Sequence, residues 1–429
     1  MVKSKRFKSL NEKVLSHPFI NSVLIYDIEC SSLDTETAQV KFVGCYSYRY
    51  EKFFIIGHDE LDKFELLLRE HRVLVGFNNK SFDNEVLMNK VNNVDLSYKV
   101  IFDCLRVLYD TDRKRPNREL IIKHKGRTLH ESLKNRKLRT VAETLGFETL
   151  KGDIDYKIFQ KNHWSQSELG EIYKYLLADV DVTRLLFEFY VEYFSCFTEF
   201  VDDKNISRFD YIRSSTGSFA YNAICYMANL DYVYEDDTSK RKSLNTFKGG
   251  FVLEPKKEYA EDVLYLDLVS LYPSIYIQCN LFSNNCSCCS DDEKWSGSGF
   301  FDVKGKYCSK KRGKIESLIL DFFMKRKKYK KNNDSKELPI KIFMNSLYGI
   351  SSSPLFKSLY HEYCGSDCTL IGRTILEYSL KCFESAGFPV VYADTDSCFV
   401  ELNGKSEDEA LMVANDVIRF VQSKMPFPF

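Results

Sequence analysis

Two carboxylates stand close together in residues 390–400, where the chain reads VVYADTDSCFV. Apolar, β-prone runs flank Asp394 and Asp396, a pattern that predicts a strand, a tight turn and a second strand. Carboxylates this close repel each other and raise each other's pKa unless a cation lies between them. The stretch therefore indicates either a divalent-metal site or an ordinary polar turn, because Asp and Ser are common turn residues.

A third carboxylate lies far upstream, in residues 263–276, which read VLYLDLVSLYPSIY. We expect a buried strand that ends at Asp267, followed by a turn of the chain from Ser270 to Pro273. Asp267 would complete, with the two acids of residues 390–400, the carboxylate set of a two-metal site.

The first half of the chain holds a separate group of acids. Residues 22–30 read as a buried strand, SVLIYDIEC, with Asp27 and Glu29 two positions apart. Because side chains of a strand alternate between its faces, both carboxylates belong to one face. Further strands are predicted at residues 40–48, 52–56 and 73–77, and a helix at residues 61–69.

Two more elements bring acids to this group. Asp83 follows the strand of residues 73–77 and precedes a predicted helix, and strand ends of this kind are where open α/β sheets place their sites. A long amphipathic helix over residues 167–189 carries Tyr175 and Asp179 one turn apart on one face. Acids from three separate elements can converge on two divalent ions, which together clamp the reacting oxygens of a phosphodiester.

A predicted pair of helices, residues 313–332 and 338–348, presents cations. Their side chains share faces at helical spacing, and the break at residues 333–335 between the two helices indicates an antiparallel hairpin. Counting from the tip, the arrangement brings Arg326 and Lys341 side by side, as a triphosphate would need. A surface helix that is merely rich in lysine is the alternative. The cationic and polar residues concerned are Arg326 and Lys330, then Lys341, Asn345 and Tyr348.

Composition limits the class of protein. The chain has 429 residues, with 44% hydrophobic and 28% charged, and we expect two to four soluble domains. No run approaches 18 apolar residues and the basic N-terminus has no apolar core, so neither a membrane helix nor a signal peptide is predicted. Formal net charge is zero, but residues 113–139 and 304–331 are rich in Lys and Arg, which indicates either contact with a polyanion or solvated faces.

The 14 cysteines, without secretory features, indicate reduced thiols in a cytoplasmic setting. Four of them could form a metal cluster. Their spacing matches no standard zinc pattern, so the sequence favours free thiols over a structural zinc. The four are Cys286, Cys288, Cys289 and Cys308.

The acids of the first half form an ordered set: Asp-x-Glu at 27–29, Phe-Asp at 82–83 and Tyr-x-x-x-Asp at 175–179. This set resembles the proofreading 3′–5′ exonucleases of the RNase H-like fold. The resemblance implies that Asp27, Glu29, Asp83 and Asp179 are catalytic and hold divalent metal, and that Tyr175 orients the attacking water. It also implies that Asn78 or Asn79, together with Phe82, contacts a single-stranded 3′ end.

The second half resembles family B DNA polymerases. DLVSLYPSI (267–275), KIFMNSLYG (341–349) and YADTDS (392–397) are similar to motifs A, B and C of that family, and FKGG (247–250) is similar to its linker motif. A further segment, TLIGR (369–373), resembles a family segment near the template. All appear in the order of the family.

The resemblance implies specific roles. Asp267, the carbonyl of Leu268 and Asp396 would hold two Mg²⁺ ions, for which Mn²⁺ could substitute, and Asp394 would support them. Tyr272 would lie beneath the sugar and select dNTPs. The predicted nucleotide contacts also include Arg326, Lys330, Lys341, Asn345 and Tyr348, with Gly349 packing beside the nascent base pair, and the predicted DNA contacts include Lys248, Gly249, Gly250, Gly372 and Arg373.

The implied architecture is a multidomain α/β protein with an RNase H-like exonuclease domain and a polymerase palm, an antiparallel sheet with helices, plus two-helix fingers. We expect the exonuclease domain at residues 1–190, a connector at 191–246, palm at 247–300, fingers at 301–349 and palm again at 350–429. The implied activity is template-directed DNA synthesis from dNTPs on primer-template DNA, with 3′–5′ proofreading.

The resemblance breaks near the end of the sequence. No Lys-x-Tyr follows Asp396, although family members carry that motif in a thumb domain. Either the sequence is a piece of a longer polymerase or a second polypeptide supplies the thumb, in a split and virus-encoded enzyme acting in the host cytoplasm. Motifs A and B are close in sequence, which favours extension of a nucleic-acid primer over protein priming.

Two other functions fit parts of the pattern. One is a stand-alone 3′–5′ exonuclease with a vestigial polymerase half, and the other is a non-catalytic DNA-binding subunit. Both would tolerate loss of Asp267, Asp394 and Asp396, and all three acids are intact.

Overall fold

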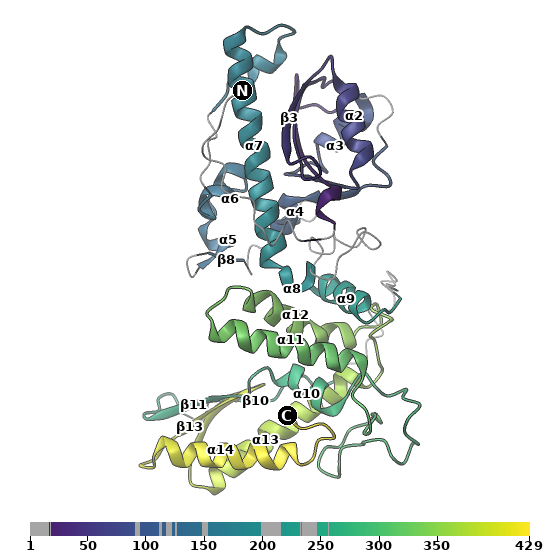
Figure 1. The fold of residues 1–429 in the computed structure, drawn as a ribbon. Helices are drawn as coiled ribbons and strands as arrows, with labels where there is room; N and C mark the ends of the chain where they lie inside the picture. Colours follow the sequence, from purple (N-terminus) through teal and green to yellow (C-terminus); the bar gives the residue numbers. More distant parts are fainter. Residues whose placement is uncertain are drawn as a thin grey trace. The chain divides into compact units, whose positions relative to one another are not determined.

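A computed structural model describes residues 17, 19–90, 95–110, 114–116, 122–124, 127–147, 153–198, 216–231, 233, 247–255 and 257–429. It divides the chain into two units, residues 1–219 and 220–429, each with its own sheet (Figure 1). The division falls inside helix α9, Thr216–Met227. The mixed α/β character predicted from the sequence is confirmed, and the finer domain boundaries stay predictions.

The first unit is organised on a five-stranded sheet of order β3-β2-β1-β4-β5. The first three strands are antiparallel neighbours, whereas β1, β4 and β5 run parallel. The four strands predicted from the sequence are confirmed, and the fifth was not predicted. The strands are β1 (Val23–Cys30), β2 (Val40–Ser47), β3 (Lys52–Gly57), β4 (Val73–Gly76) and β5 (Val100–Asp103).

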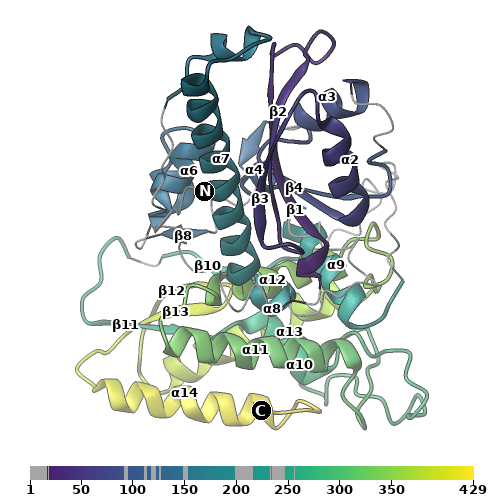
Figure 2. The same cartoon turned by 45° about the horizontal axis from the view of Figure 1, so that its top comes forward.

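Helices cover both faces of this sheet (Figures 1 and 2). Helices α2 (Leu61–Glu70) and α3 (Asp83–Lys90) lie on one face, and α7 (Gln166–Tyr193) lies on the other. Leu24, Tyr26 and Ile28 of β1 belong to the core beneath α2 and α3. Because strand residues alternate, Asp27 and Glu29 belong to the opposite face, which α7 covers.

Helix α7 begins at a capping box and is fixed near its middle by a buried ion network. Ser165 accepts from the backbone of Glu168, whose carboxylate accepts in return from the Ser165 backbone. Further along, Arg184, of which only 2% of the side chain is exposed, pairs with Glu188 at 2.6 Å and with Asp181 at 2.7 Å. The hydroxyl of Tyr48 on the adjoining loop donates to Glu188 at 2.9 Å. The network therefore joins the helix to the end of β2.

Short elements complete the first unit. Residues 113, 117–121 and 125–126 of the basic stretch at residues 113–139 lie outside the described residues, and its predicted contact with DNA stays a prediction. The short elements are η1 (Ile20–Ser22), α4 (Cys104–Leu108), β6 (Tyr109–Asp110), β7 (Arg115–Pro116), β8 (Lys123–His124), β9 (Arg127–Thr128), α5 (Leu129–Ser132), α6 (Leu138–Thr144), η2 (Tyr156–Gln160) and α8 (Ser195–Thr198).

The second unit holds an antiparallel sheet of order β10-β12-β13-β11. Its strands are β10 (Val252–Leu253), β12 (Val390–Asp394), β13 (Ser397–Glu401) and β11 (Val263–Asp267). Helices α13 (Cys364–Ser385) and α14 (Glu407–Gln422) contribute to one apolar core with β12 and β13. The predicted strand–turn–strand at residues 390–400 is confirmed.

The expectation of a buried strand at residues 263–267 was wrong. Strand β11 is the edge of the sheet, and its residues alternate between exposed and half-buried. An edge strand has a neighbour on one side only, so an apolar run does not ensure burial on both faces. The predicted turn through Pro273 also ends earlier, because Ser270 adopts a left-handed conformation and helix α10 (Leu271–Cys279) begins directly after it.

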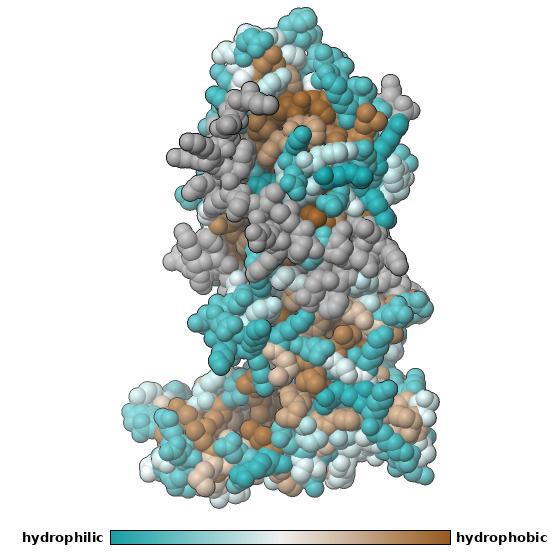
Figure 3. Space-filling view, viewed as in Figure 1, coloured by the Kyte–Doolittle hydropathy of each residue, from teal (hydrophilic) through white to brown (hydrophobic). Residues whose placement is uncertain are grey.

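The predicted pair of helices is confirmed as α11 (Lys314–Lys331) and α12 (Glu337–Ser351). They pack through Phe322 and Phe343, whose ring centroids lie 4.7 Å apart. The tip of this hairpin is hydrophilic in Figure 3, in keeping with its lysine-rich sequence. Among the helices that the structure describes, none is long and apolar enough to cross a membrane.

Replacing Arg184 by methionine should strongly destabilise the first unit. The change leaves the carboxylate of Glu188 buried without its cation, and removal of one partner of a buried pair costs about 3–5 kcal/mol. Chemical denaturation of the full chain, followed by fluorescence and by hydrogen exchange in α7, measures this loss. Arg139→Met is the matched control, because Arg139 and Glu143 form an exposed pair, and it should unfold almost as the unchanged protein does. Equal stability of the two variants would contradict the assigned role of the network.

Candidate active sites

The hairpin of β12 and β13 delivers the first candidate site. Asp394 pairs with Ser397 across the turn, and the Asp396 amide donates to the Asp394 carbonyl at 2.6 Å. Thr395 between them has a left-handed backbone, with φ at +52°. Its amide donates to the carbonyl of Phe251 at 2.8 Å, so the turn is fixed from outside as well. The tight turn is therefore what brings two acids to one end of the sheet.

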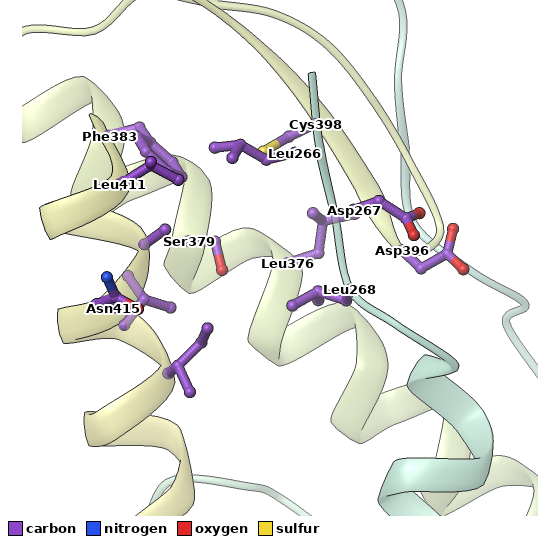
Figure 4. A pocket seen from close by; sticks show the side chains of 13 residues that line it. Leu266, Asp267, Leu268, Leu376, Ser379, Phe383, Asp396, Cys398, Leu411 and Asn415 are labelled. Carbon is purple, nitrogen blue, oxygen red and sulfur yellow. The ribbon is translucent and has the colours of Figure 1, made fainter. Parts of the chain in front are cut away.

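Strand register adds the third acid. Asp267 pairs with Ser397, and the amide of Leu268 donates to the carbonyl of Asp396 at 2.7 Å. Figure 4 shows the Asp267 and Asp396 side chains beside each other at one end of a cavity of about 210 Å³. Leucines and Phe383 line much of that cavity, between the sheet and helices α13 and α14.

The electrostatics of this pair favour a cation. Burial raises the pKa of Asp396, the nearby Asp267 raises it further, and Lys341 lowers it. The Asp394 carboxylate accepts from the Thr395 hydroxyl at 2.8 Å and from the Tyr392 hydroxyl at 3.4 Å, and the Asp267 carboxylate accepts from the Tyr265 hydroxyl at 3.2 Å. Asp267 affects the pKa of Asp396 more than Asp394 does, so a divalent ion between Asp267 and Asp396 would relieve the stronger repulsion.

Aromatic rings gather beside the acids. Tyr272 at the start of α10 lies 5.2 Å from Tyr348 of α12, measured between ring centroids, and Phe247 lies 6.4 Å from Tyr348. Burial is the main cause that raises the pKa of Tyr272 to about 12. Gly372 on α13 is buried against Tyr272, and a Cβ there would lie 3.3 Å from the ring. Gly372 thus makes room for the ring, and its predicted contact with DNA stays a prediction.

The glycine segment at 247–250 is tied to the same site. Arg373 donates to the carbonyls of Lys248 at 2.6 Å and Gly249 at 2.7 Å. A Cβ at Gly250 would lie 2.5 Å from the hydroxyl of Thr395, so only glycine allows this approach to the turn. The segment is therefore held between helix α13 and the acid-bearing hairpin.

One cation of the helical hairpin contacts an acid that the sequence prediction did not include, and the predicted proximity of Arg326 and Lys341 stays a prediction. Arg326 donates to Glu337 at 2.7 Å across the hairpin and also contacts the hydroxyl of Ser270. Glu337 lies one turn before Lys341 and was not singled out from the sequence. Counting residues from the tip at Asp334 pairs Arg326 with Lys341 rather than with Glu337, so this contact could not be found in that way. Lys330, Lys341 and Asn345 are exposed.

A second candidate site lies in the first unit. Oxygen atoms of Asp27, Glu29 and Asp179 all lie within 4.8 Å of one another, which is close enough for one metal ion to bind all three. Glu29 and Asp179 are buried, and Asp27 is half-buried. The predicted convergence of β1 and α7 is thereby confirmed for these three acids, which offer the hard oxygen ligands that Mg²⁺ and Mn²⁺ prefer.

A glycine on β2 lets the helix approach the strand. Gly44 pairs with Asp27, and a Cβ at Gly44 would lie 3.0 Å from Val180 and 3.3 Å from Leu176 of α7. These two helix residues flank Asp179 in sequence. The distance between the carboxylates of β1 and that of α7 therefore depends on the missing side chain at Gly44.

Two tyrosines border this carboxylate group. Burial and then Asp179, Glu29 and Asp27 raise the pKa of Tyr175, which also hydrogen-bonds Asp179. Tyr156 on η2, which sequence reasoning missed, responds to the same acids: burial and then Glu29 raise its pKa to about 12. Tyr156 belongs to no sequence motif, so only the three-dimensional structure indicates that it lies near these acids.

Asp83 lies beside the group rather than within it. Its carboxylate accepts from the Ile28 amide of β1 at 3.3 Å, and burial is the main cause that raises its pKa to about 7. Asp103, at the end of β5, also raises the pKa of Asp83. Asp103 is itself buried and was missed, although an apolar run followed by an acid is the same signal that identified Asp83.

The two candidate asparagines have different surroundings. Asn78 is half-buried with φ at +64°, and its backbone amide donates to the Asp103 carboxylate at 2.8 Å. Asn79 is 1% exposed, and its side chain donates to the hydroxyl of Tyr26 at 3.1 Å. Phe82 is half-buried against the core beneath α2 and α3. Asn78 is therefore the more accessible of the two asparagines.

Comparisons with known proteins match each unit to a family. Residues 220–429 match the sequence model of DNA polymerase family B, and residues 24–190 match that of the RNase_H superfamily. A DNA polymerase from Archaeoglobus fulgidus is 26% identical over 347 residues, which cover 79% of this chain and 43% of that protein. DNA polymerase 1 of Pyrococcus abyssi is 25% identical over 385 residues, covering 82% and 48%.

A solved structure of the family B DNA polymerase from the hyperthermophilic archaeon Pyrobaculum calidifontis has 19% sequence identity and a TM-score of 0.49, covering 94% of this chain and 55% of that chain. The chain thus spans about half the length of the archaeal relatives named above. The chain combines a region similar to family B DNA polymerases with a region similar to the RNase H superfamily. The virus-encoded origin, the cytoplasmic location and the second polypeptide stay predictions.

Replacing Gly44 by alanine should separate α7 from the sheet. The added methyl group meets Val180 and Leu176, and overpacking of this kind costs about 1–3 kcal/mol. The Mn²⁺ affinity of the three-acid site should fall as the helix moves away. Calorimetry on the full chain measures it, in a background that lacks the carboxylate of Asp396 so that the other candidate metal site does not contribute. Gly170→Ala is the control on α7, where a Cβ meets no atom within 4 Å; it should leave Mn²⁺ binding unchanged. Unaltered binding in Gly44→Ala would contradict the proposed dependence on close approach.

Proposed function

We propose that this protein synthesises DNA on a primer-template from dNTPs and removes mispaired 3′ ends with a separate 3′–5′ exonuclease site. The observation that carries the proposal is the pair Asp267 and Asp396, joined by strand register and a backbone hydrogen bond of 2.7 Å beside Lys341. The match of residues 220–429 to DNA polymerase family B supports it. The polymerase residues fall in the second unit and the exonuclease residues in the first.

The donor set of the polymerase site fits divalent magnesium. Asp267 and Asp396, with the carbonyl of Leu268, would hold the ions, because hard cations prefer carboxylate and carbonyl oxygens. When bound, such ions lower the pKa of the primer hydroxyl and neutralise charge on the transferred phosphate. Asp394 orients the turn through its bonds to Thr395 and Tyr392.

The side chains around the pair would position the nucleotide. Lys341 and Lys330 are exposed on the helical hairpin, and Arg326 is half-buried between Glu337 and Ser270. Cations placed there compensate the charge of a triphosphate and of its leaving pyrophosphate. Arg326 would exchange one of its present partners for phosphate oxygens. This hairpin is the proposed fingers domain.

Tyr272 would select the sugar. Its ring packs on Tyr348 and is supported from behind by Gly372, so it is held firmly rather than free to rotate away. A rigid ring beneath the sugar excludes a 2′-hydroxyl by steric overlap. The Lys248–Gly250 segment, which Arg373 fixes in place, would contact DNA, since the paired glycines at 249 and 250 let the backbone approach nucleic acid closely.

In the exonuclease site, Asp27, Glu29 and Asp179 would hold the metal. Tyr175, which is hydrogen-bonded to Asp179, would orient the attacking water. Asp83, which accepts from the Ile28 amide of β1, would stand beside this group as a further buried carboxyl. Asn78, the more accessible of the two asparagines, would contact the single-stranded 3′ end, with Phe82 next to it.

Asp396→Asn should reduce primer extension by at least about a hundredfold, because a ligand to the metal contributes no less than the groups that orient it. Degradation of a single-stranded 3′ end by the same protein should continue at an unchanged rate. Gel assays with a labelled primer measure both. Asp416→Asn, on the exposed surface of α14, is the control and should extend normally. Undiminished extension by Asp396→Asn would refute the assignment.

Asp179→Asn should have the opposite pattern. Loss of one of the three converging carboxylates should slow 3′–5′ degradation by at least about a hundredfold while leaving primer extension intact. The control is Glu171→Gln, an exposed residue on the same helix. If Asp179→Asn also abolished extension, the two activities would share a site and the assignment to separate units would fail.

A further inference from the structure

The segment between helices α10 and α11 has no helix or strand of its own. Over residues 280–313 the only ladder contact is one bridge between Trp295 and Tyr307. Structureless connections of this length are uncommon inside compact domains unless something else orders them. Residues 283–294 read SNNCSCCSDDEK and offer no aliphatic or aromatic side chain for a core. Hydrophobic burial therefore does not account for the conformation of this part.

Four cysteines meet in this segment. The Sγ atoms of Cys286, Cys288, Cys289 and Cys308 all lie within 4.8 Å of one another. The Sγ–Sγ distances are 3.9 Å from Cys288 to Cys289, 3.3 Å from Cys288 to Cys308 and 3.6 Å from Cys289 to Cys308. All four are unpaired thiols, since a disulfide requires about 2.05 Å between sulfur atoms.

These separations fit a single tetrahedral ion. Zinc binds thiolate sulfur at about 2.3 Å, which places the corners of its tetrahedron about 3.8 Å apart. The three distances lie on both sides of that value. A cluster of several irons holds its four cysteines around a larger core, so it needs wider separations than a single ion does.

The surroundings of the cysteines suit a negatively charged thiolate centre. Backbone amides of Ser309 and Lys310 donate toward the Cys289 sulfur. The side chains of Lys294 and Lys310 are electrostatically coupled to the cysteines and are also paired with Asp291 at 3.0 Å and Glu293 at 2.6 Å. Amide donors and nearby cations are the outer contacts that orient and stabilise thiolate ligands.

We propose that Cys286, Cys288, Cys289 and Cys308 bind one structural Zn²⁺ ion that fixes residues 280–313. Sequence spacing pointed the other way, because Cys288 and Cys289 are adjacent and so match no standard zinc pattern. The fourth ligand, Cys308, directly follows Tyr307, and the bridge between Tyr307 and Trp295 brings it back to the other three cysteines. On binding, the thiols release their protons to solvent as the zinc–sulfur bonds form.

The site would stabilise the base of the helical hairpin. The amide of Cys308 donates to the Ser283 carbonyl at 2.9 Å, and Asn280 donates to the carbonyl of Cys308 at 2.9 Å and accepts from the Gly313 amide at 2.9 Å. Helix α10 therefore ends, and α11 begins, on residues bonded directly to the cysteine segment. A metal there would restrain the start of α11 without contacting Asp267 or Asp396.

Metal content of the full chain tests the proposal. Protein purified under reducing conditions should hold about one zinc per chain by plasma mass spectrometry, and Cys308→Ser should hold less than about a tenth of that. Cys382→Ser is the matched control, since Cys382 is a half-buried thiol on α13 outside the group. It should keep its zinc. A full zinc content in Cys308→Ser would overturn the proposal.

A second measurement does not depend on the folding of a variant. Unchanged protein stripped of zinc and loaded with Co²⁺ should show the visible absorption of a tetrahedral tetrathiolate ion together with near-ultraviolet sulfur-to-cobalt bands. Absence of these tetrahedral and sulfur-to-cobalt bands, or metal-free protein with four freely titrating thiols, would refute the site, whereas Co²⁺ bound at the carboxylate sites contributes only the weak absorption of octahedral cobalt. A Cys288–Cys308 disulfide in freshly isolated protein would refute it as well, and stoichiometric iron would overturn the choice of zinc.

Discussion

Carboxylates gathered at the ends of strands are the constraint on which both units depend. Like charges at such distances repel, so each unit needs rigid backbone contacts to keep its acids together. In the second unit those contacts are strand register and two short backbone hydrogen bonds around Asp394, Asp396 and Leu268. Burial and then the charge of Asp267 raise the pKa of Asp396, and a divalent cation beside the two acids would offset both effects.

The first unit meets the same constraint through helix packing. Asp27 and Glu29 share strand β1 and need no further alignment, but Asp179 lies on helix α7, which must pack against the sheet to bring its carboxylate to theirs. The absence of a side chain at Gly44 sets how near that helix comes. The buried Arg184 network then fixes the helix farther along its length. A glycine and an ion network thus do for one site what backbone register does for the other.

Local patterns predicted much of this arrangement. The alternation of β1 placed Asp27 and Glu29 on one face, and the tight turn at Thr395 was evident from its flanking β-prone runs. Features that depend on distant partners were missed or wrong. The exposure of β11 follows from its place at the edge of the sheet, Glu337 matters through Arg326, and Tyr156 matters through acids far away in sequence. The cysteine group was discounted because spacing rules assume ligands arranged in standard pairs. Here the bridge between Trp295 and Tyr307 brings Cys308 back to the other three cysteines.

The pairing of β11 with β13 has a consequence for how the chain acquires its fold. Asp267 is synthesised long before Ser397, the residue opposite it, and strand β10 must wait equally for β12. Contacts between residues so distant in sequence form slowly, because the loop between them must first be closed. The α11–α12 hairpin and the cysteine segment lie inside that loop and are built from near neighbours in sequence. They can therefore fold first and shorten the effective distance, so that the last element to form is the one that carries the acids.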